Sequence, residues 1–206
     1  MALLGGSITV SRLRARKAPA DPKRSIQKGL RSAAFEPLVP GAEEDRAIGF
    51  VELEDHDAVE FPVSSVFHGE HVLFGFRIDT IRVRGADVKA ELERWTAAFA
   101  DEHGRPPARR EKAAHRDAIR QRLRAATPPT TRVHDVSWNL ATGEVLVWTA
   151  SRKVVEEIVA AIETAFRASL APASAAGLAA AAGIDPESLS PTAALVGAGT
   201  GREEAR

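Results

Sequence analysis

The clearest hydrophobic pattern in the chain is a strict alternation over residues 72–83. Val72, Phe74, Phe76 and Ile78 are apolar, and the positions between them are mixed. A period of two is typical of a β-strand with one buried face. We therefore predict a long strand here, as the backbone of an antiparallel sheet.

The period changes after Gly85, where apolar residues recur every three or four positions. Val88, Leu92, Trp95 and Phe99 form one stripe of an amphipathic helix. We expect this helix to end near Gly104, because glycine commonly terminates helices.

Prolines mark the bounds of a second long helix. Pro106 and Pro107 break the first helix, and Pro128 and Pro129 stop the one that follows. The two helices together form a long excursion between two strands.

The remaining patterns predict further strands and helices around this excursion. We expect helices at residues 21–33 and 151–166, strands at 7–13 and 48–53, a short edge strand within 61–67, and a hairpin around 141–143. The order indicates an α+β fold, with an antiparallel sheet packed by helices.

From Ala171 onward the composition shifts to Ala, Gly, Ser and Pro. Such a segment buries little apolar surface, so we expect a poorly ordered Ala-rich tail with a short helix near residues 175–182. We divide the chain into a domain at residues 1–170 and a tail at 171–206.

Lys and Arg balance Asp and Glu at 28 each, and there is no cysteine. The lack of cysteine excludes disulfides, thiolate zinc sites and cysteine nucleophiles. No stretch approaches the roughly 18 apolar residues of a membrane span, so we expect a cytoplasmic protein without membrane contact.

The neutral total conceals a basic segment at residues 105–124, which has eight Lys/Arg and two Asp/Glu. At about 100° per residue, most of these cations share a sector of roughly 80° on the helix. The row would extend about 28 Å and present guanidinium groups that suit phosphate. Its members are Arg105, Arg109, Lys112, Arg116 and Arg120, with Arg124 beside them.

A charged helix is often only a solvated surface, and that alternative stays open. Against it, only Glu111 and Asp117 are available for pairing within the helix. Lys28 and Arg31 on the first helix are weaker additions to the same candidate surface.

Several segments, in order, resemble the bacterial recombination-associated protein RdgC family. They are ITVSRL, SAAFEPL, VLFGFRIDT followed by two long helices with a basic second one, VSWNLATGEVLV and SRKVVEEIVAAIETAF, within residues 7–170. The resemblance implies non-specific DNA binding by a ring-like dimer that restrains recombinase filaments. It implies no catalytic residue.

The chain departs from that family in two places. The family's Leu-Pro-Arg-Ala-Phe type segment is here LRAATPPTTR, without the aromatic residue. Family proteins also continue into a second half that helps close the ring, whereas this chain continues into the Ala-rich tail. It is either a shortened relative or it assembles differently.

Three rival hypotheses come from other residues. His56, Asp57, His68 and His71 could hold a metal, but H-x-x-H in a turn lacks the helical spacing of zinc proteases. An acidic run could hold Mg²⁺ for a nuclease-like reaction, and the basic helix could bind an acidic protein. The acidic run is Glu52, Glu54, Asp55, Asp57 and Glu60.

The sequence therefore predicts a non-enzymatic, sequence-nonspecific DNA-binding protein of recombination or replication. We expect double-stranded DNA as partner, a homodimer, functional competition with a recombinase and a nucleoid-associated location. We expect no metal, because the histidines lack the spacing of a zinc site, and no cofactor. GAGTG at residues 197–201 lacks the strand and the Lys-Ser/Thr of a phosphate loop, so we assign it to the tail.

Overall fold

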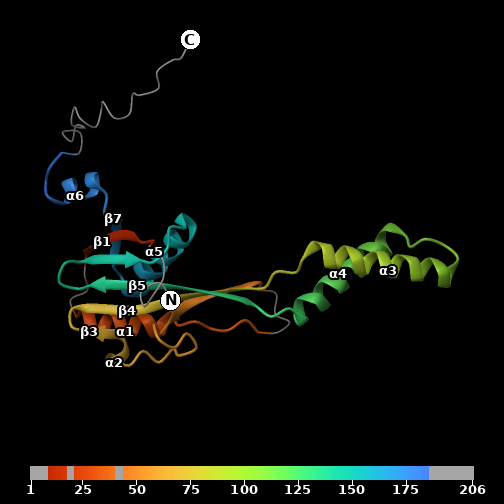
Figure 1. Ribbon diagram of the computed structural model, residues 1–206, viewed down its shortest axis with the longest axis horizontal. Coiled ribbons are helices and arrows are strands. Elements are labelled where there is room, and N and C mark those ends of the chain that lie inside the picture. The colour runs from red at the N-terminus through yellow and green to blue at the C-terminus, as the bar shows by residue number, and fades with distance from the viewer. Residues whose placement is uncertain (1–8, 18–20, 40–43, 186–206) are drawn as a thin grey trace, which may run out of the picture.

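The centre of the molecule is an antiparallel β-sheet in the strand order β2-β4-β5-β6-β1-β7, with β3 paired to β4 (Figure 1). This computed structural model describes residues 9–17, 21–39 and 44–185. The strands are β1 Ser11–Lys17, β2 Arg46–Val51, β3 Phe67–His68, β4 His71–Thr80, β5 Thr130–Asn139, β6 Glu144–Val147 and β7 Ser169–Pro172. The predicted α+β fold with an antiparallel sheet is confirmed.

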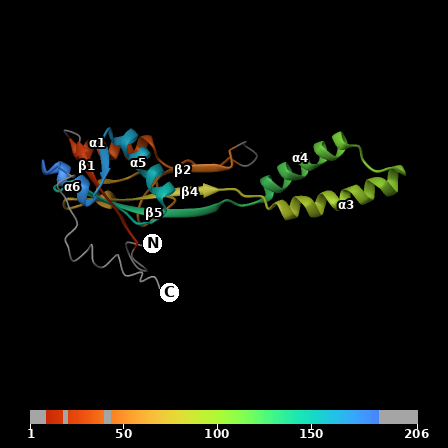
Figure 2. The ribbon, with the colours of Figure 1, turned by 90° about the horizontal axis from the view of Figure 1, so that it is seen from above.

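Helices α1 and α5 lie side by side on one face of this sheet (Figure 2). The helices are α1 Pro22–Ser32, α2 Val63–Val66, α3 Gly85–His103, α4 Arg109–Ala126, α5 Arg152–Phe166 and α6 Ala175–Ala181. Asp21 caps α1, with its carboxylate accepting a hydrogen bond from the amide of Arg24 at 3.2 Å.

The core lies between the sheet and these two helices. The alternating apolar residues of β4 face it, and Phe74 and Phe76 meet Phe50 of β2 edge-on at ring-centroid distances of 5.3 and 5.6 Å. Trp138 and Phe166 complete the aromatic cluster, and Trp138 is fully buried. The predicted buried face of β4 is confirmed, and Val136, Val145 and Val147 of the β5–β6 hairpin are buried on the same side.

Close approach of α1 to α5 depends on a glycine. A Cβ atom at Gly29 would come within 2.1 Å of the Phe166 ring and 2.7 Å of the Ala165 carbonyl oxygen. Because the second contact is to backbone, no side-chain rotation relieves it. Any larger residue at position 29 would therefore force α1 and the end of α5 apart.

The β4–β5 pair also carries the two-helix excursion. The two strands pair along their whole length, from His71 with Asn139 to Thr80 with Thr130. Helices α3 and α4 follow directly and extend away from the sheet as an antiparallel hairpin, here called the arm (Figure 1). The predicted pair of long helices is confirmed.

Several predicted bounds need correction, among them the strand expected at residues 48–53, which is β2 at Arg46–Val51. The edge strand expected within residues 61–67 is present only at Phe67, which begins the two-residue strand β3. The residues before it form the short helix α2, in which the carbonyl oxygen of Pro62 accepts hydrogen bonds from the amides of Ser65 and Val66. Proline has no backbone N–H, but the first N–H groups of a helix have no partner within the helix, so proline is well tolerated at a helix start.

The first strand was expected at residues 7–13 and is observed from Ser11 to Lys17; residues 7 and 8 lie outside the described part of the chain. Strand β4 ends at Thr80, where its pairing with β2 and β5 ends.

The Ala-rich segment is partly in the fold. Strand β7, at Ser169–Pro172, pairs with β1 and spans the boundary that we predicted between the domain and the tail. Helix α6 follows where a short helix was predicted. Residues 186–206, including GAGTG, lie outside the described part of the chain.

Candidate nucleic-acid interface

The arm has a small hydrophobic core of its own. Val88 and Leu92 of α3 and Ile119 of α4 are buried against one another, with Trp95 and Leu123 partly buried beside them. This cluster is separate from the core under the sheet. The arm is therefore a distinct packing unit joined to the body through its strands.

Ring stacking continues the contact toward the tip. His115 of α4 stacks on Trp95 with ring centroids 4.1 Å apart, and Trp95 contacts Phe99 at 5.3 Å. His103 stacks on Phe99 at 4.1 Å. The apolar stripe of α3 thus packs within the arm, as its periodicity predicted.

The tip is closed by an ion pair that the sequence did not reveal. Arg105 lies before α4 begins and donates two hydrogen bonds of 2.9 Å to Glu111, while its guanidinium lies 5.1 Å from the Phe99 ring centroid. Glu111 also accepts from the amide of Ala108 at 2.7 Å. The Arg105 hydrogen bonds, together with this amide, lower the pKa of Glu111 to about 2, so the pair is ionised at neutral pH.

The opposite end of the predicted row is also engaged. Arg124 pairs with Asp45 and donates to the carbonyl oxygen of Glu44, so it ties the base of the arm to the segment before β2. Its side chain is only 18% exposed. Arg105 and Arg124 are therefore structural as well as cationic.

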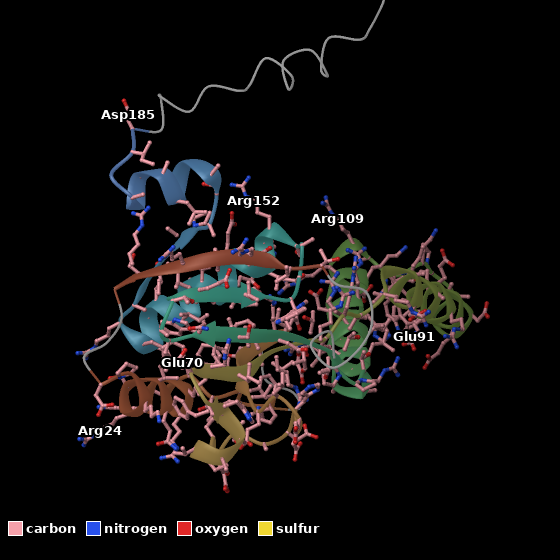
Figure 3. All side chains as sticks on the ribbon, turned by 60° about the vertical axis from the view of Figure 1, so that its left-hand side comes forward. Arg24, Glu70, Glu91, Arg109, Arg152 and Asp185 are labelled. Carbon is pink, nitrogen blue, oxygen red and sulfur yellow. The ribbon has the colours of Figure 1, made fainter. Side chains whose placement is uncertain are left out.

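The middle of the row is presented to solvent. Arg109, Arg116 and Arg120 are exposed and Lys112 is half-buried. Within the described chain, no carboxylate pairs with Arg109, Lys112 or Arg116, and Arg120 has only Asp117 at 4.0 Å. These four side chains, here called the basic row, cover about 16 Å of helix at 1.5 Å per residue. Figure 3 shows Arg109 pointing outward at the start of α4.

A groove between the two helices adjoins the basic row. It encloses about 390 Å³. Lys112, Arg116 and Arg120 line one side, and Lys89 and Glu93 of α3 line the other. Lys89 and Glu93 form an exposed pair at 3.9 Å. Sequence reasoning missed Lys89. Its place beside Val88, at the edge of the apolar stripe, is the signal that could have indicated it.

Charge is divided between the two helices of the arm. Helix α4 carries seven Lys/Arg and two acids, whereas α3 carries five acids and two Lys/Arg. One cross-helix pair, Arg122 with Glu91, uses the side of α4 away from the basic row. The arm thus has one strongly basic side.

The structure does not bring Lys28 and Arg31 to the basic row. Both lie on α1 under the sheet, at the far end of the molecule from the arm (Figure 1). Arg31 donates to the carbonyl oxygen of Glu60 at 2.9 Å. Any part they take in binding would be at a separate surface.

Several of the candidate acidic and histidine residues make bonds within or beside the loop between β2 and β4. Glu52 accepts from the amide of Phe61 at 3.0 Å, and Asp57 pairs with Arg77 at 2.5 Å. His68 and His71 contact Ser65 and Asn139, respectively. Within the ranges that the structure describes, no three His, Asp or Glu side chains form a group able to hold a metal.

Arg77, unlike the exposed arginines of the basic row, is held by acidic side chains within the body. It donates a bidentate pair to Asp79 at 2.9 and 3.0 Å, and it lies 4.4 Å from the ring centroid of Phe35. The hydrogen bond with Asp79 is the largest cause of its raised pKa, with burial opposing. Arg77 is thus a structural residue of the sheet face opposite α1 and α5.

No protein-family model matches this chain, and no curated protein matches it. The resemblance to the RdgC family stays a prediction from the sequence. Among the described helices, none is long and apolar enough to cross a membrane.

Proposed function

We propose that this protein binds double-stranded DNA without sequence preference through the basic row of its arm. The observation that carries the proposal is a set of four cations on one exposed helix side, three of them with no acidic partner among the described residues. Uncompensated cations in a row repel one another, and a polyanion relieves that repulsion.

The spacing of the row supports a phosphate backbone as the polyanion. One strand of B-DNA carries a charge about every 3.4 Å along the axis, so a row of about 16 Å covers several consecutive phosphates. Arginine predominates in it, and its planar donors bind phosphate bidentately. Such contacts give affinity and position and do not read bases.

We further propose that two copies act together and limit the access of a recombinase to DNA. The recombination role rests on the sequence resemblance alone. The dimer has a physical argument: the basic side of one arm contacts one side of a duplex, and a second copy doubles the phosphates contacted.

A second candidate is an acidic protein helix, favoured by one observation. The groove beside the basic row is bordered by Val83, Val88 and Leu92 as well as by cations. An amphipathic acidic helix could place apolar side chains there, which DNA cannot do. The nuclease-like alternative has no such support, because two of the candidate acids, Glu52 and Asp57, already bond to Phe61 and Arg77.

Fluorescence anisotropy with two unrelated duplexes of ~30 bp tests the proposal. The full chain is compared with Arg116→Gln/Arg120→Gln and with the control Arg94→Gln/Arg110→Gln, which removes the same charge from other sides of the arm. We expect equal binding of both duplexes and a loss of affinity of roughly tenfold or more only in the first variant.

Sedimentation of the same samples counts the chains on each duplex, and we expect two. Equal affinities of the two variants would contradict a role for the basic row. A strong preference for one duplex would contradict non-specific binding. Failure of the full chain to bind DNA at low salt, with retention of an acidic helical peptide, would favour the second candidate.

A further inference from the structure

A second cationic hollow lies on the body, on the sheet face that carries α1 and α5. It encloses about 520 Å³ and lies where β4 and β5 extend beyond the start of α5. Three arginines from three different segments line it: Arg46, Arg82 and Arg132. Volumes of this size are typical of pockets for small molecules.

The strand register explains why the hollow is polar. On this face, Phe76 of β4 is paired with His134, Ile78 with Arg132 and Thr80 with Thr130. The aromatic core therefore ends at Phe76, and the next residue pairs bring cations and hydroxyls to the surface. Thr149 and Ser151 add two more hydroxyls from the segment before α5.

The positive charge of the hollow is poorly compensated. Arg46 is paired with Glu157 at 2.5 and 2.9 Å, but Arg82 and Arg132 form no ion pair with any residue that the structure describes. The described side chains that line the hollow include no Asp or Glu. A free anion would therefore be attracted to it.

The start of α5 adds to this imbalance. Ser151 occupies the N-cap position without a side-chain capping bond, and the first turn contains no acid. Instead it carries Arg152 and Lys153, although the positive end of a helix dipole favours negative charge there. Ser151 and Val154 border the hollow, so the unused amides of this turn lie beside it.

A histidine lies beside the arginines of the hollow. The Nε2 atom of His134, which lines the hollow, is buried without a hydrogen-bond partner in the described chain. Buried polar atoms are nearly always paired in folded proteins. Burial, and then the charge of Arg132, lowers the pKa of His134 against the opposing effect of Asp135, which favours a neutral ring near neutral pH.

We propose that this hollow binds the phosphate group of a small phosphorylated molecule. Arg82 and Arg132 hold the phosphate oxygens, the hydroxyls of Thr80 and Thr130 donate to them, and the first turn of α5 faces the same charge. Ile78 and Val154 offer an apolar contact for the remainder of the ligand. The site is distinct from the basic row and does not depend on it.

Calorimetric titration of the full chain with inorganic pyrophosphate at low ionic strength tests the proposal. We expect saturable one-site binding that sodium chloride of equal ionic strength does not reproduce. Arg82→Gln/Arg132→Gln should weaken it at least tenfold. Lys23→Gln/Arg24→Gln, an equal charge change on α1, should leave it unchanged, and so should Arg116→Gln/Arg120→Gln.

A measurement on the unmutated protein guards against variants that misfold. In amide NMR spectra, pyrophosphate should shift the resonances of residues 151–154 and 130–134 and leave those of α4 unchanged. Shifts confined to α4 would overturn the proposal, as would the absence of saturable binding or equal binding by the hollow variant.

The phosphate in the hollow could belong to a small molecule or to the DNA backbone. Repeating the duplex titration with Arg82→Gln/Arg132→Gln, the hollow variant, distinguishes the two. We expect DNA affinity to be retained within about threefold. A parallel loss of DNA and pyrophosphate affinity would assign the hollow to the DNA backbone and overturn the small-molecule proposal. Because the basic row is intact in this variant, the outcome is independent of the proposed function.

Discussion

At the residue scale, the arginines of this chain fall into two groups: those held by acidic partners and those exposed without one among the described residues. Arg77 is 15% exposed at its side chain and is held by Asp79 and Asp57, whereas Arg109 and Arg116 are exposed with no acidic partner in the described chain. Sequence spacing cannot separate these cases, because the partners of Arg77 come from its own strand face and from a loop 20 residues away. The burial of Asp79 makes the difference, since a buried acid requires a cation.

Arg77→Met should therefore destabilise the body strongly. Asp79 is 2% exposed and would lose its bidentate partner, which costs about 3 kcal/mol of unfolding free energy for a buried pair. Urea unfolding at pH 7 measures the change. The control is Arg84→Met, which breaks an exposed pair with Asp87 and should cost less than about 1 kcal/mol. Equal effects of the two substitutions would contradict the structural role of Arg77.

The sequence did not show that the two ends of the predicted row, Arg105 and Arg124, are held in ion pairs. The positions of Arg109, Lys112, Arg116 and Arg120 follow from helical periodicity, and the structure places them on one side of α4. Arg105 falls outside the helix because Ala108 and Glu111 form the true start. The pairing of Arg124 with Asp45 spans 79 residues, so no local pattern could indicate it.

At the element scale, long periodic segments were predictable and short ones were not. The two helices of the arm and strand β4 follow from periods of 3.6 and 2 over ten residues or more. The four residues of α2 are too few for a period, and their helical form depends on the local bonds to Pro62. The hollow beside α5 depends on strand register, which side-chain patterns alone do not give.

The arm should behave as a separate cooperative unit, because its hydrophobic cluster is its own. Ile119→Ala removes a side chain that is 3% exposed from that cluster and should cost about 2 kcal/mol or more. Amide hydrogen exchange should quicken in α3 and α4 and stay unchanged in α5 and central β4.

The matched control is Ile158→Ala, the same chemical change in the core under the sheet. It should quicken exchange in the body as well, because that core holds the whole fold together. Uniform loss of protection in the Ile119→Ala variant would show that the arm and the body unfold as one.

At the scale of the whole molecule, charge is distributed unevenly, so that the arm has one basic side and one acidic side. The chain is neutral overall, yet α4 is basic, α3 is acidic, and both extend from the sheet between the end of β4 and the start of β5 (Figure 1). A polyanion is therefore attracted to one side of the arm and repelled from the other. The overall composition could not show this division of charge, because it depends on how the charged residues are distributed between α3 and α4 and on which side of each helix packs against the other.

The two cationic sites also differ in shape. The basic row lies along an exposed helix, which suits an extended polyanion, whereas the hollow beside α5 is lined from several segments, which suits a compact one. This contrast is why we assign DNA to the arm and a small phosphorylated molecule to the body.

The most direct test of the DNA proposal is the salt dependence of duplex affinity. The account predicts a linear fall of log affinity with log salt, and a slope reduced by about two per bound chain in Arg116→Gln/Arg120→Gln but not in Arg94→Gln/Arg110→Gln. Identical slopes for wild type and both variants would contradict the claim that the basic row contacts phosphates.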